Sequence, residues 1–226
     1  MRRTGLVLLA GLAPLTLACQ APLHAAEKTV AAPMAERQSR EGSGLQTALF
    51  AGGCFWGVEA VFSHTRGVTS AISGYHGGTA RSARYDLVSS GITDHAEVVK
   101  VTYDPRIIRY DQLLRIYFSV IVDPTLRNRQ GPDEGPQYRS ALIPLSAEQR
   151  ATATAYLVQL RWSGLWSDPI VTAIEPAGKF HAAEAYHQDF AAKNPRHAYI
   201  VRWDAPKVAA LARLYPGVYR KDFRRS

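Results

Sequence analysis

Cysteine is scarce in this chain, which holds only Cys19 and Cys54 among its 226 residues. Cys19 lies in an N-terminal segment with the composition of an export signal, so the mature chain is expected to keep Cys54 alone. One thiol cannot form an internal disulfide, even in a compartment that favours disulfides. A redox function for Cys54 would therefore need a second thiol from another molecule.

Long apolar runs are missing too. The N-terminal apolar stretch covers residues 5–18, which is short for a helix that crosses a membrane. It follows two arginines and precedes a run of small residues, an order typical of a secretory signal peptide over residues 1–26. We expect an exported, periplasmic protein. The alternative is a lipoprotein anchored to the membrane through Cys19.

A motif that reads nucleic acid is also missing, although the formal net charge is +8. Removal of residues 1–26 removes Arg2 and Arg3 and no acidic residue, which leaves +6. We expect no nucleic-acid partner, because the basic residues form no clustered face in the sequence. Residues 27–44 are polar without an apolar period, which predicts a flexible leader before a single catalytic domain over 45–226. We expect this domain to be a monomer.

From Leu45 onward, the apolar pattern predicts strands that alternate with helices. The predicted strands cover residues 45–52, 68–75, 95–103, 138–143 and 169–175. The predicted helices cover residues 54–62, 83–90, 110–121, 147–162 and 179–193. We expect Ser82 and Ser146 to cap two of these helices, and only weak helix after residue 193. Short connections favour an α+β fold, a two-layer α/β sandwich with a ferredoxin-like core and long loops around the active site.

Cys54 follows an apolar run and two glycines and precedes a helical pattern, which places it at a strand-to-helix junction. Free backbone N–H groups and the positive end of the helix dipole would face its sulfur and favour the thiolate, the reactive form of cysteine. Phe55 and Trp56 would give this nucleophile apolar walls. The alternative from local sequence is a buried structural cysteine.

Glu97 lies on a predicted strand, where it shares one face with Val99 and Val101. If that face points inward, loss of water raises the pKa of the carboxyl and keeps it protonated near neutral pH. A protonated carboxyl is a proton donor, as a general acid must be. The alternative is a glutamate that reaches solvent at the end of the strand.

A polar loop covers residues 123–138 and holds three prolines and two glycines. Such a long loop inside a compact domain is more often functional than a plain connection. Tyr138, at the predicted start of a strand, offers a hydroxyl donor. Tyr85, in the short helix before the Glu97 strand, offers another.

Five motifs in order resemble the A-type peptide methionine sulfoxide reductases, from about Thr47 to about Asn194. They are Gly53-Cys54-Phe55-Trp56-Gly57, His95-Ala96-Glu97, Arg129-Gln130-Gly131, Gln137-Tyr138-Arg139-Ser140 and Ala183-Glu184-Ala185-Tyr186-His187-Gln188. The resemblance implies repair of oxidised proteins under oxidative stress, by reduction of the S epimer of methionine sulfoxide, free or in proteins.

The resemblance also implies a role for each matching residue. Cys54 would attack the sulfoxide sulfur, and Glu97 would give a proton to the departing oxygen. Tyr85 and Tyr138 would hydrogen-bond that oxygen, and Asp133 would help to fix the site. Phe55 and Trp56 would hold the methyl group of the substrate. The product on Cys54 would be a sulfenic acid, which a second thiol converts to a disulfide.

Three departures from the family pattern stand out. Asp94 precedes His95, and Pro132 precedes Asp133, where the family often has glycine and asparagine. Many members also carry a resolving cysteine soon after the Asn-Pro pair, but none follows Asn194-Pro195 here. We therefore expect no bound cofactor and an external reductant, either a thioredoxin-like protein or a small thiol.

Three other interpretations stay open. A cysteine-dependent hydrolase or acyltransferase would need a base beside the thiol, and five histidines are available in residues 64–187. A metal site could use His181, Glu184 and His187, but one pair on a predicted helix is a poor metal cage, and we expect no metal. An inactive relative that only binds methionine sulfoxide would have lost a key group, yet the motifs keep them all.

Overall fold

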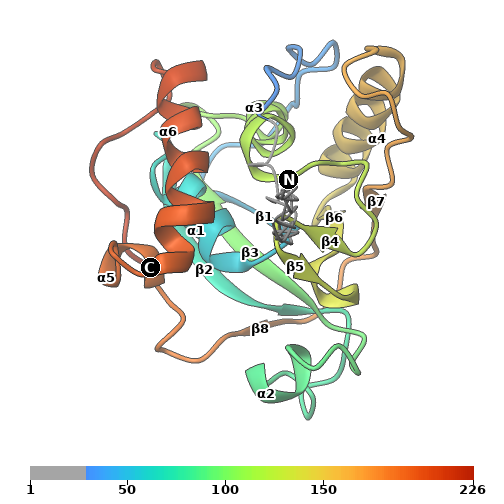
Figure 1. Cartoon of the computed structure of the whole chain (residues 1–226). Coiled ribbons are helices and arrows are strands. Elements are labelled where there is room, and N and C mark those ends of the chain that lie inside the picture. Colours follow the sequence, from blue (N-terminus) through green and yellow to red (C-terminus); the bar gives the residue numbers. More distant parts are fainter. Residues whose placement is uncertain (1–28) are drawn as a thin grey trace, which may run out of the picture.

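A six-stranded sheet covered by helices forms the body of the protein, as the computed structural model shows for residues 29–226 (Figure 1). The sheet strands are β1 (Gln46–Gly52), β2 (Val68–His76), β3 (Ala96–Tyr103), β6 (Ser140–Ile143), β7 (Ala173–Ile174) and β8 (Phe180–Ala182). The signal peptide and lipid anchor predicted over residues 1–26 lie outside the described residues. Within 29–226, no helix has the length and apolar character needed to cross a membrane.

Helices and short elements complete the chain. The α-helices are α1 (Phe55–Ser63), α2 (Tyr85–Val88), α3 (Tyr110–Ile116), α4 (Ala147–Trp162), α5 (Phe190–Lys193) and α6 (Ala205–Leu214). Two π-helical turns cover η1 (Tyr117–Ile121) and η3 (Ile200–Asp204), and a 3-10 turn covers η2 (Pro136–Tyr138). A small hairpin pairs β4 (Arg129–Gln130) with β5 (Asp133–Glu134).

The strand order β7-β6-β1-β3-β2-β8 contains a ferredoxin-like core. Its four central strands, β6-β1-β3-β2, pair antiparallel throughout. Helix α1 connects β1 to β2 across β3, and α3 with η1 connects β3 to β6 across β1. Edge strand β7 adds in parallel to β6, and β8 adds antiparallel to β2. The predicted two-layer α+β fold is confirmed.

Strand alternation divides the apolar side chains between the two faces of the sheet. Phe50, Val99 and Val101 belong to the large cluster that the helices cover, together with Phe62 of α1 and Leu113 of α3. The opposite face carries a smaller cluster of six buried residues. Each large apolar side chain buried in this way contributes roughly 1.5–3 kcal/mol. Because Glu97 shares a face with Val99 and Val101, it points into the helix-covered side.

The predicted helix over residues 179–193 is wrong. Residues 180–182 form β8, which pairs with β2, and the chain then turns until α5 begins at Phe190. Asp189 has a positive φ of 55°, which ends any continuous helix there. Gln188 donates its side-chain amide to the Ser73 carbonyl at 2.9 Å and so fixes these turns to the sheet edge. Long-range pairing has overridden a helical apolar pattern.

Other predicted elements shift in extent. The helix over 110–121 continues as predicted but changes to π geometry at Tyr117. Ser146 caps α4 by accepting the Gln149 N–H at 3.1 Å, as predicted. Ser82 does not cap a helix, because α2 begins only at Tyr85 and the Ser82 hydroxyl donates to the Thr79 carbonyl. The predicted strand over 169–175 is reduced to β7, and α6 is a well-formed helix where weak helix was expected.

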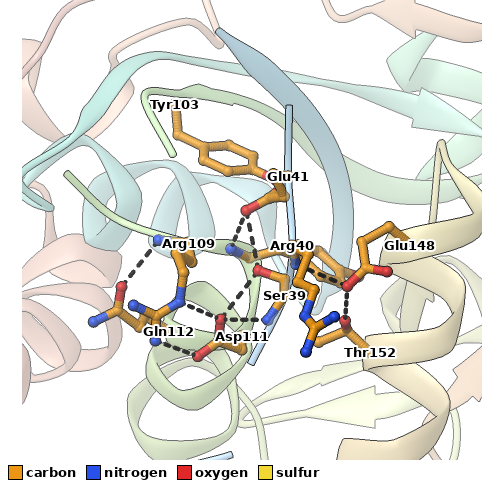
Figure 2. A network of polar contacts seen from close by, with 10 residues as sticks. Ser39, Arg40, Glu41, Tyr103, Arg109, Asp111, Gln112, Glu148 and Thr152 are labelled. Carbon is orange, nitrogen blue, oxygen red and sulfur yellow. Dashed lines mark hydrogen bonds and ion pairs between the residues drawn. The ribbon is translucent and has the colours of Figure 1, made fainter. Parts of the chain in front are cut away.

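Residues 29–44 form an N-terminal strap against α3 and α4, so the prediction of a flexible leader is wrong for them (Figure 2). Ser39 donates its N–H and its hydroxyl to Asp111 of α3, both at 3.0 Å. Glu148 of α4 accepts from Arg40 N at 2.8 Å and from Arg37 at 2.7 Å. The strap binds mainly through hydrogen bonds and ion pairs, with Ala32 buried in the core, so its polar composition does not make it flexible.

Candidate active site

Cys54 is the N-cap residue of α1, directly after β1. Gly53 before it has φ of 80°, and a Cβ there would lie 2.5 Å from Cβ of Gln130. The backbone of Asp123 holds the side-chain amide of Gln130. The amide oxygen accepts the Asp123 N–H and the amide nitrogen donates to the Asp123 carbonyl, both at 2.9 Å. Two of the sequence motifs therefore meet at Gly53, and the long loop packs directly against the residue before the thiol. Within residues 29–226, Cys54 is the only cysteine.

The Cys54 thiol is partly exposed, and its pKa is raised well above the usual value. Loss of water is the largest cause, and the carboxyls of Glu97, Asp204 and Asp133 add to it. The Trp56 backbone N–H lowers the pKa, but it is outweighed. The expected thiolate at the helix N-terminus is therefore wrong for the free protein, because burial, together with three nearby carboxyls, outweighs the helix dipole. The resting group is a thiol.

Glu97 is buried behind the thiol, with 2% of its surface exposed. Its Oε2 accepts the Phe55 backbone N–H at 2.9 Å, one residue beyond Cys54. The pKa of Glu97 is raised to about 8, mainly by burial; the Phe55 N–H opposes this rise, and the charges of Asp133 and Asp204 add to it. The carboxyl is therefore mostly protonated at pH 7, and the alternative of a solvent-exposed glutamate is wrong.

Tyr85 and Tyr138 lie on separate short elements, which the side chain of Gln137 connects. Tyr85 begins α2, and Tyr138 ends η2 rather than starting a strand, as had been predicted. Gln137 donates to the Ser89 carbonyl after α2 at 3.1 Å, which ties the two elements together. Burial and the Glu97 charge raise the pKa of Tyr85 to about 12 and also raise the pKa of Tyr138. Both hydroxyls therefore keep their protons and remain hydrogen-bond donors.

Trp56 and Phe55 differ in their surroundings. Trp56 stacks on Phe190 with ring centroids 3.7 Å apart and planes 7° from parallel, and Tyr199 meets it edge-on at 5.8 Å. Phe55 is 1% exposed and packs against Tyr75 at 5.9 Å. Trp56 therefore remains available as an apolar wall, whereas Phe55 supports that wall from the core.

Asp133 lies in β5 and accepts a hydrogen bond from the Tyr199 hydroxyl. Sequence reasoning missed Tyr199, because it follows Asn194-Pro195 in a segment with no apolar period. Asp204 was missed as well. It is 1% exposed, and its Oδ1 lies 2.4 Å from the position that a Cβ on Gly57 of α1 would take. Helices α1 and α6 lie side by side, which places Asp204 near the start of α1 (Figure 1).

The proposed metal ligands lie in turns and a strand, not on one helix face. His181 is in β8, and its ring packs edge-on against His95 at 5.8 Å. Glu184 accepts from the Tyr75 hydroxyl at 2.8 Å and from Tyr85 N at 2.9 Å. Among the described residues, no group of three His, Cys, Asp or Glu side chains is arranged to hold a metal ion.

Histidine activation of Cys54 also finds no support in residues 29–226. The charged groups that raise the Cys54 pKa are carboxyls, and no hydrogen bond in this part of the chain joins the thiol to a histidine. A cysteine hydrolase needs such a base to activate its nucleophile. The arrangement instead supplies a thiol, a neutral carboxyl and two hydroxyl donors, a set that suits attack on a group whose oxygen must be protonated.

Comparisons with known proteins agree with this chemistry. The family model described as "Peptide methionine sulfoxide reductase" matches residues 46–215. The chain is 51% identical over 176 residues to Peptide methionine sulfoxide reductase MsrA 2 of Mesorhizobium japonicum, covering 78% of this chain and 90% of the relative. It is 48% identical over 177 residues to Peptide methionine sulfoxide reductase MsrA of Deinococcus radiodurans, covering 78% and 85%.

Solved structures show the same likeness. Reduced Mxr1 from Saccharomyces cerevisiae matches with a TM-score of 0.62 and 34% identity, covering 72% of this chain and 92% of that one. Methionine sulfoxide reductase A of Corynebacterium diphtheriae matches with a TM-score of 0.57 and 33% identity, covering 69% and 78%. With the site geometry and a family match over most of its length, the chain belongs to the peptide methionine sulfoxide reductase family and reduces methionine sulfoxide.

Proposed function

We propose that the protein reduces methionine (S)-S-oxide, free or in proteins, to methionine, with Cys54 as the nucleophile and Glu97 as the general acid. The observation that carries this assignment is the position of Glu97. Its buried carboxyl binds the N–H of Phe55, next to the only thiol in residues 29–226, and its pKa of about 8 keeps it protonated at neutral pH. A reductive site for sulfoxides needs such an acid beside its nucleophile.

The first half of the reaction transfers one oxygen atom. Glu97 gives its proton to the sulfoxide oxygen as the Cys54 sulfur attacks the substrate sulfur, and Glu97 then takes up the proton that the thiol loses. The attack forms a sulfur–sulfur bond between Cys54 and the substrate. This bond and the sulfur–oxygen bond of the substrate then break as the hydroxyl moves to the Cys54 sulfur, where a new sulfur–oxygen bond forms. The substrate sulfur is reduced by one electron pair and the Cys54 sulfur is oxidised by the same pair, which gives methionine and a sulfenic acid.

Tyr85 and Tyr138 donate hydrogen bonds to the sulfoxide oxygen in this proposal, because burial keeps both hydroxyls protonated. Trp56 packs against the methyl group of the substrate, with Phe55 behind it, and Asp133 with Tyr199 fixes this side of the site. In the S epimer, the oxygen faces the two tyrosine hydroxyls while the methyl group faces Trp56. In the R epimer, oxygen and methyl would exchange places, and an oxygen against Trp56 would lose its hydrogen bonds.

The second half of the cycle needs an external thiol. An incoming thiol condenses with the Cys54 sulfenic acid to form a mixed disulfide and water, and a further thiol displaces Cys54 and restores it. The support is the thiol count, because residues 29–226 contain no second cysteine. A thioredoxin-like protein or a small thiol would serve, and the chemistry requires no bound cofactor.

Two further proposals concern the whole chain. Export to the periplasm is supported by the sequence of residues 1–26, and fractionation of cells that express the natural gene product would test it. A monomeric state is a prediction that light scattering during size-exclusion chromatography would test.

The decisive experiment supplies the separate S and R sulfoxides with a monothiol, a dithiol and a thioredoxin-type reductant. We expect turnover of the S form alone and none with Cys54→Ser. Without reductant, one equivalent of substrate should add the mass of one oxygen atom to Cys54. Reduction of neither epimer would refute the proposed function, and an internal Cys54 disulfide in the mature protein would refute the external thiol.

A further inference from the structure

We propose that the turn from Glu184 to His187 positions two groups of the active site. One is the Trp56 indole, which packs against the substrate methyl group, and the other is Tyr85, which donates a hydrogen bond to the sulfoxide oxygen. His187 acts on Trp56, and Glu184 acts on Tyr85. This inference rests on the proposed function, because it explains how that site keeps Trp56 and Tyr85 in fixed positions relative to each other. Neither side chain needs to touch the substrate for this role.

His187 fixes Trp56 through a directed hydrogen bond. The indole Nε1 of Trp56 donates to Nδ1 of His187 at 3.1 Å, and His187 is 1% exposed. An Nδ1 that accepts requires the neutral ring with its proton on Nε2. Burial lowers the pKa of His187 and outweighs the opposing effect of Glu184, which agrees with a neutral ring. The indole therefore has one preferred rotation rather than freedom to slide on Phe190.

The His187 ring also connects the two sides of the site. Its centroid lies 4.4 Å from that of Tyr85 and 5.0 Å from that of Phe55. Trp56 lies at 5.8 Å. A single buried imidazole thus packs against the oxygen donor and against both members of the apolar wall. Any displacement of His187 would change the distance between these groups.

Glu184 performs the matching task for Tyr85. Its Oε1 accepts the backbone N–H of Tyr85 at the start of α2, and its Oε2 accepts the Tyr75 hydroxyl of β2. Partial burial raises the pKa of Glu184, but hydrogen bonds from Tyr85 and Tyr75 lower it overall, so the carboxylate stays charged. Helix α2 has only four residues, so this contact to the sheet determines where its first residue lies.

The first test separates the hydrogen bond from the mere presence of a side chain. His187→Leu removes the acceptor, whereas His187→Asn keeps one, because the side-chain oxygen of asparagine takes the place of Nδ1. With N-acetyl-methionine-(S)-sulfoxide and dithiothreitol, we expect kcat/KM to fall about 10- to 100-fold in His187→Leu and less than about 3-fold in His187→Asn. The matched control is His181→Leu, a histidine nearby in the chain that packs on His95, and it should stay within about 2-fold of the wild type.

A spectroscopic readout tests the hydrogen bond without any substrate. The indole proton of Trp56 should exchange with water much more slowly than that of Trp162, which is 87% exposed, and its resonance should move in His187→Leu but not in His181→Leu. An exchange rate equal to that of Trp162 in the wild type would overturn the proposal, even if the leucine variant did not fold. So would equal losses of kcat/KM in His187→Leu and His187→Asn.

Glu184 is tested through Tyr85 in a double-mutant cycle. An amide at position 184 has one acceptor for two donors, so Glu184→Gln should lower kcat about 10-fold. In a Tyr85→Phe background it should lower kcat by less than about 2-fold, because the hydroxyl it positions is already gone. Additive losses would overturn this role. If the wild type reduced no sulfoxide, the proposed function would fail, while the indole measurement would still decide the His187 contact.

Discussion

Replacement of Glu97 by glutamine tests the general acid directly. The Glu97 pKa of about 8 means that about nine-tenths of the carboxyl is protonated at pH 7, against below about 1% for an ordinary glutamate. Glutamine keeps an oxygen that accepts the Phe55 N–H, but it has no acidic proton. A positioned proton donor contributes about 100- to 10,000-fold in rate, or roughly 3–5.5 kcal/mol of barrier. We expect kcat to fall within that range and substrate affinity to change far less.

The pH dependence of kcat is an independent test of Glu97 as the general acid. The wild-type rate should fall as the pH rises through about 8, because Glu97 loses the proton that it must donate. In Glu97→Gln this alkaline limb should disappear from the residual rate. The assay is kcat from pH 6 to about 9.5 with the S sulfoxide and a reductant in excess. A glutamine variant with the wild-type rate, or with the same alkaline limb, would refute the assignment.

Glu97→Gln should raise the stability of the protein although it lowers the activity. A carboxyl with a folded pKa of about 8 and an unfolded pKa of about 4.5 binds more protons when folded, so its burial costs stability as the pH rises from 4.5 to 8. At pH 7 this cost is of order 3 kcal/mol. Urea unfolding of Glu97→Gln should therefore show a stability gain that is near zero at pH 4 and largest at pH 8.

Glu59 offers a matched control within α1. It is fully buried, and burial raises its pKa to about 8 as well. Glu59→Gln should show the same pH-dependent gain in stability without the loss of kcat. If both variants lost activity equally, the effect of Glu97→Gln would come from the buried charge and not from proton donation.

Three further predictions follow from other parts of the structure. Asp111→Asn should weaken the N-terminal strap and lower the free energy of unfolding by roughly 1–3 kcal/mol in urea, with kcat unchanged, since the strap and α2 lie at opposite ends of the molecule (Figure 1); a stability equal to that of the wild type would contradict the strap contacts. Asp204→Asn should lower the pKa of Cys54 and so speed its alkylation by iodoacetamide near neutral pH; a slower reaction would contradict the carboxyl effect. Gly53→Ala should destabilise the fold by about 1–3 kcal/mol in thermal unfolding, because its φ of 80° and the contact with Gln130 leave no room for a methyl group; a neutral result would show that the loop moves aside.

Local patterns were sufficient to place Cys54 at its strand-to-helix junction and Glu97 on an apolar strand face. The alternation through β3 predicted that Glu97 shares a face with Val99, because side chains of a strand point alternately to its two faces, and the structure shows that this face is buried. The glycines before Cys54 predicted a strand-to-helix junction, which the structure has. The order of the elements predicted the ferredoxin-like core. The helix over 179–193 failed, because an apolar pattern does not show whether a segment will pair with a sheet edge instead.

The amino-acid sequence specifies which reactive groups the protein carries: one thiol in residues 29–226, one carboxyl on an apolar strand face and two tyrosines in nearby short elements. The chemical behaviour of these groups depends on the fold. The pKa of the Cys54 thiol is raised because burial removes water from it, and because the carboxyls of Glu97, Asp204 and Asp133, which lie far away in the chain, approach it in the fold. Tyr199 and His187 contact Asp133 and Trp56 through the same long-range packing. Electrostatic fields and hydrogen bonds depend on distances in space, and those distances are set by the packing of the whole chain rather than by the neighbours of each residue in sequence.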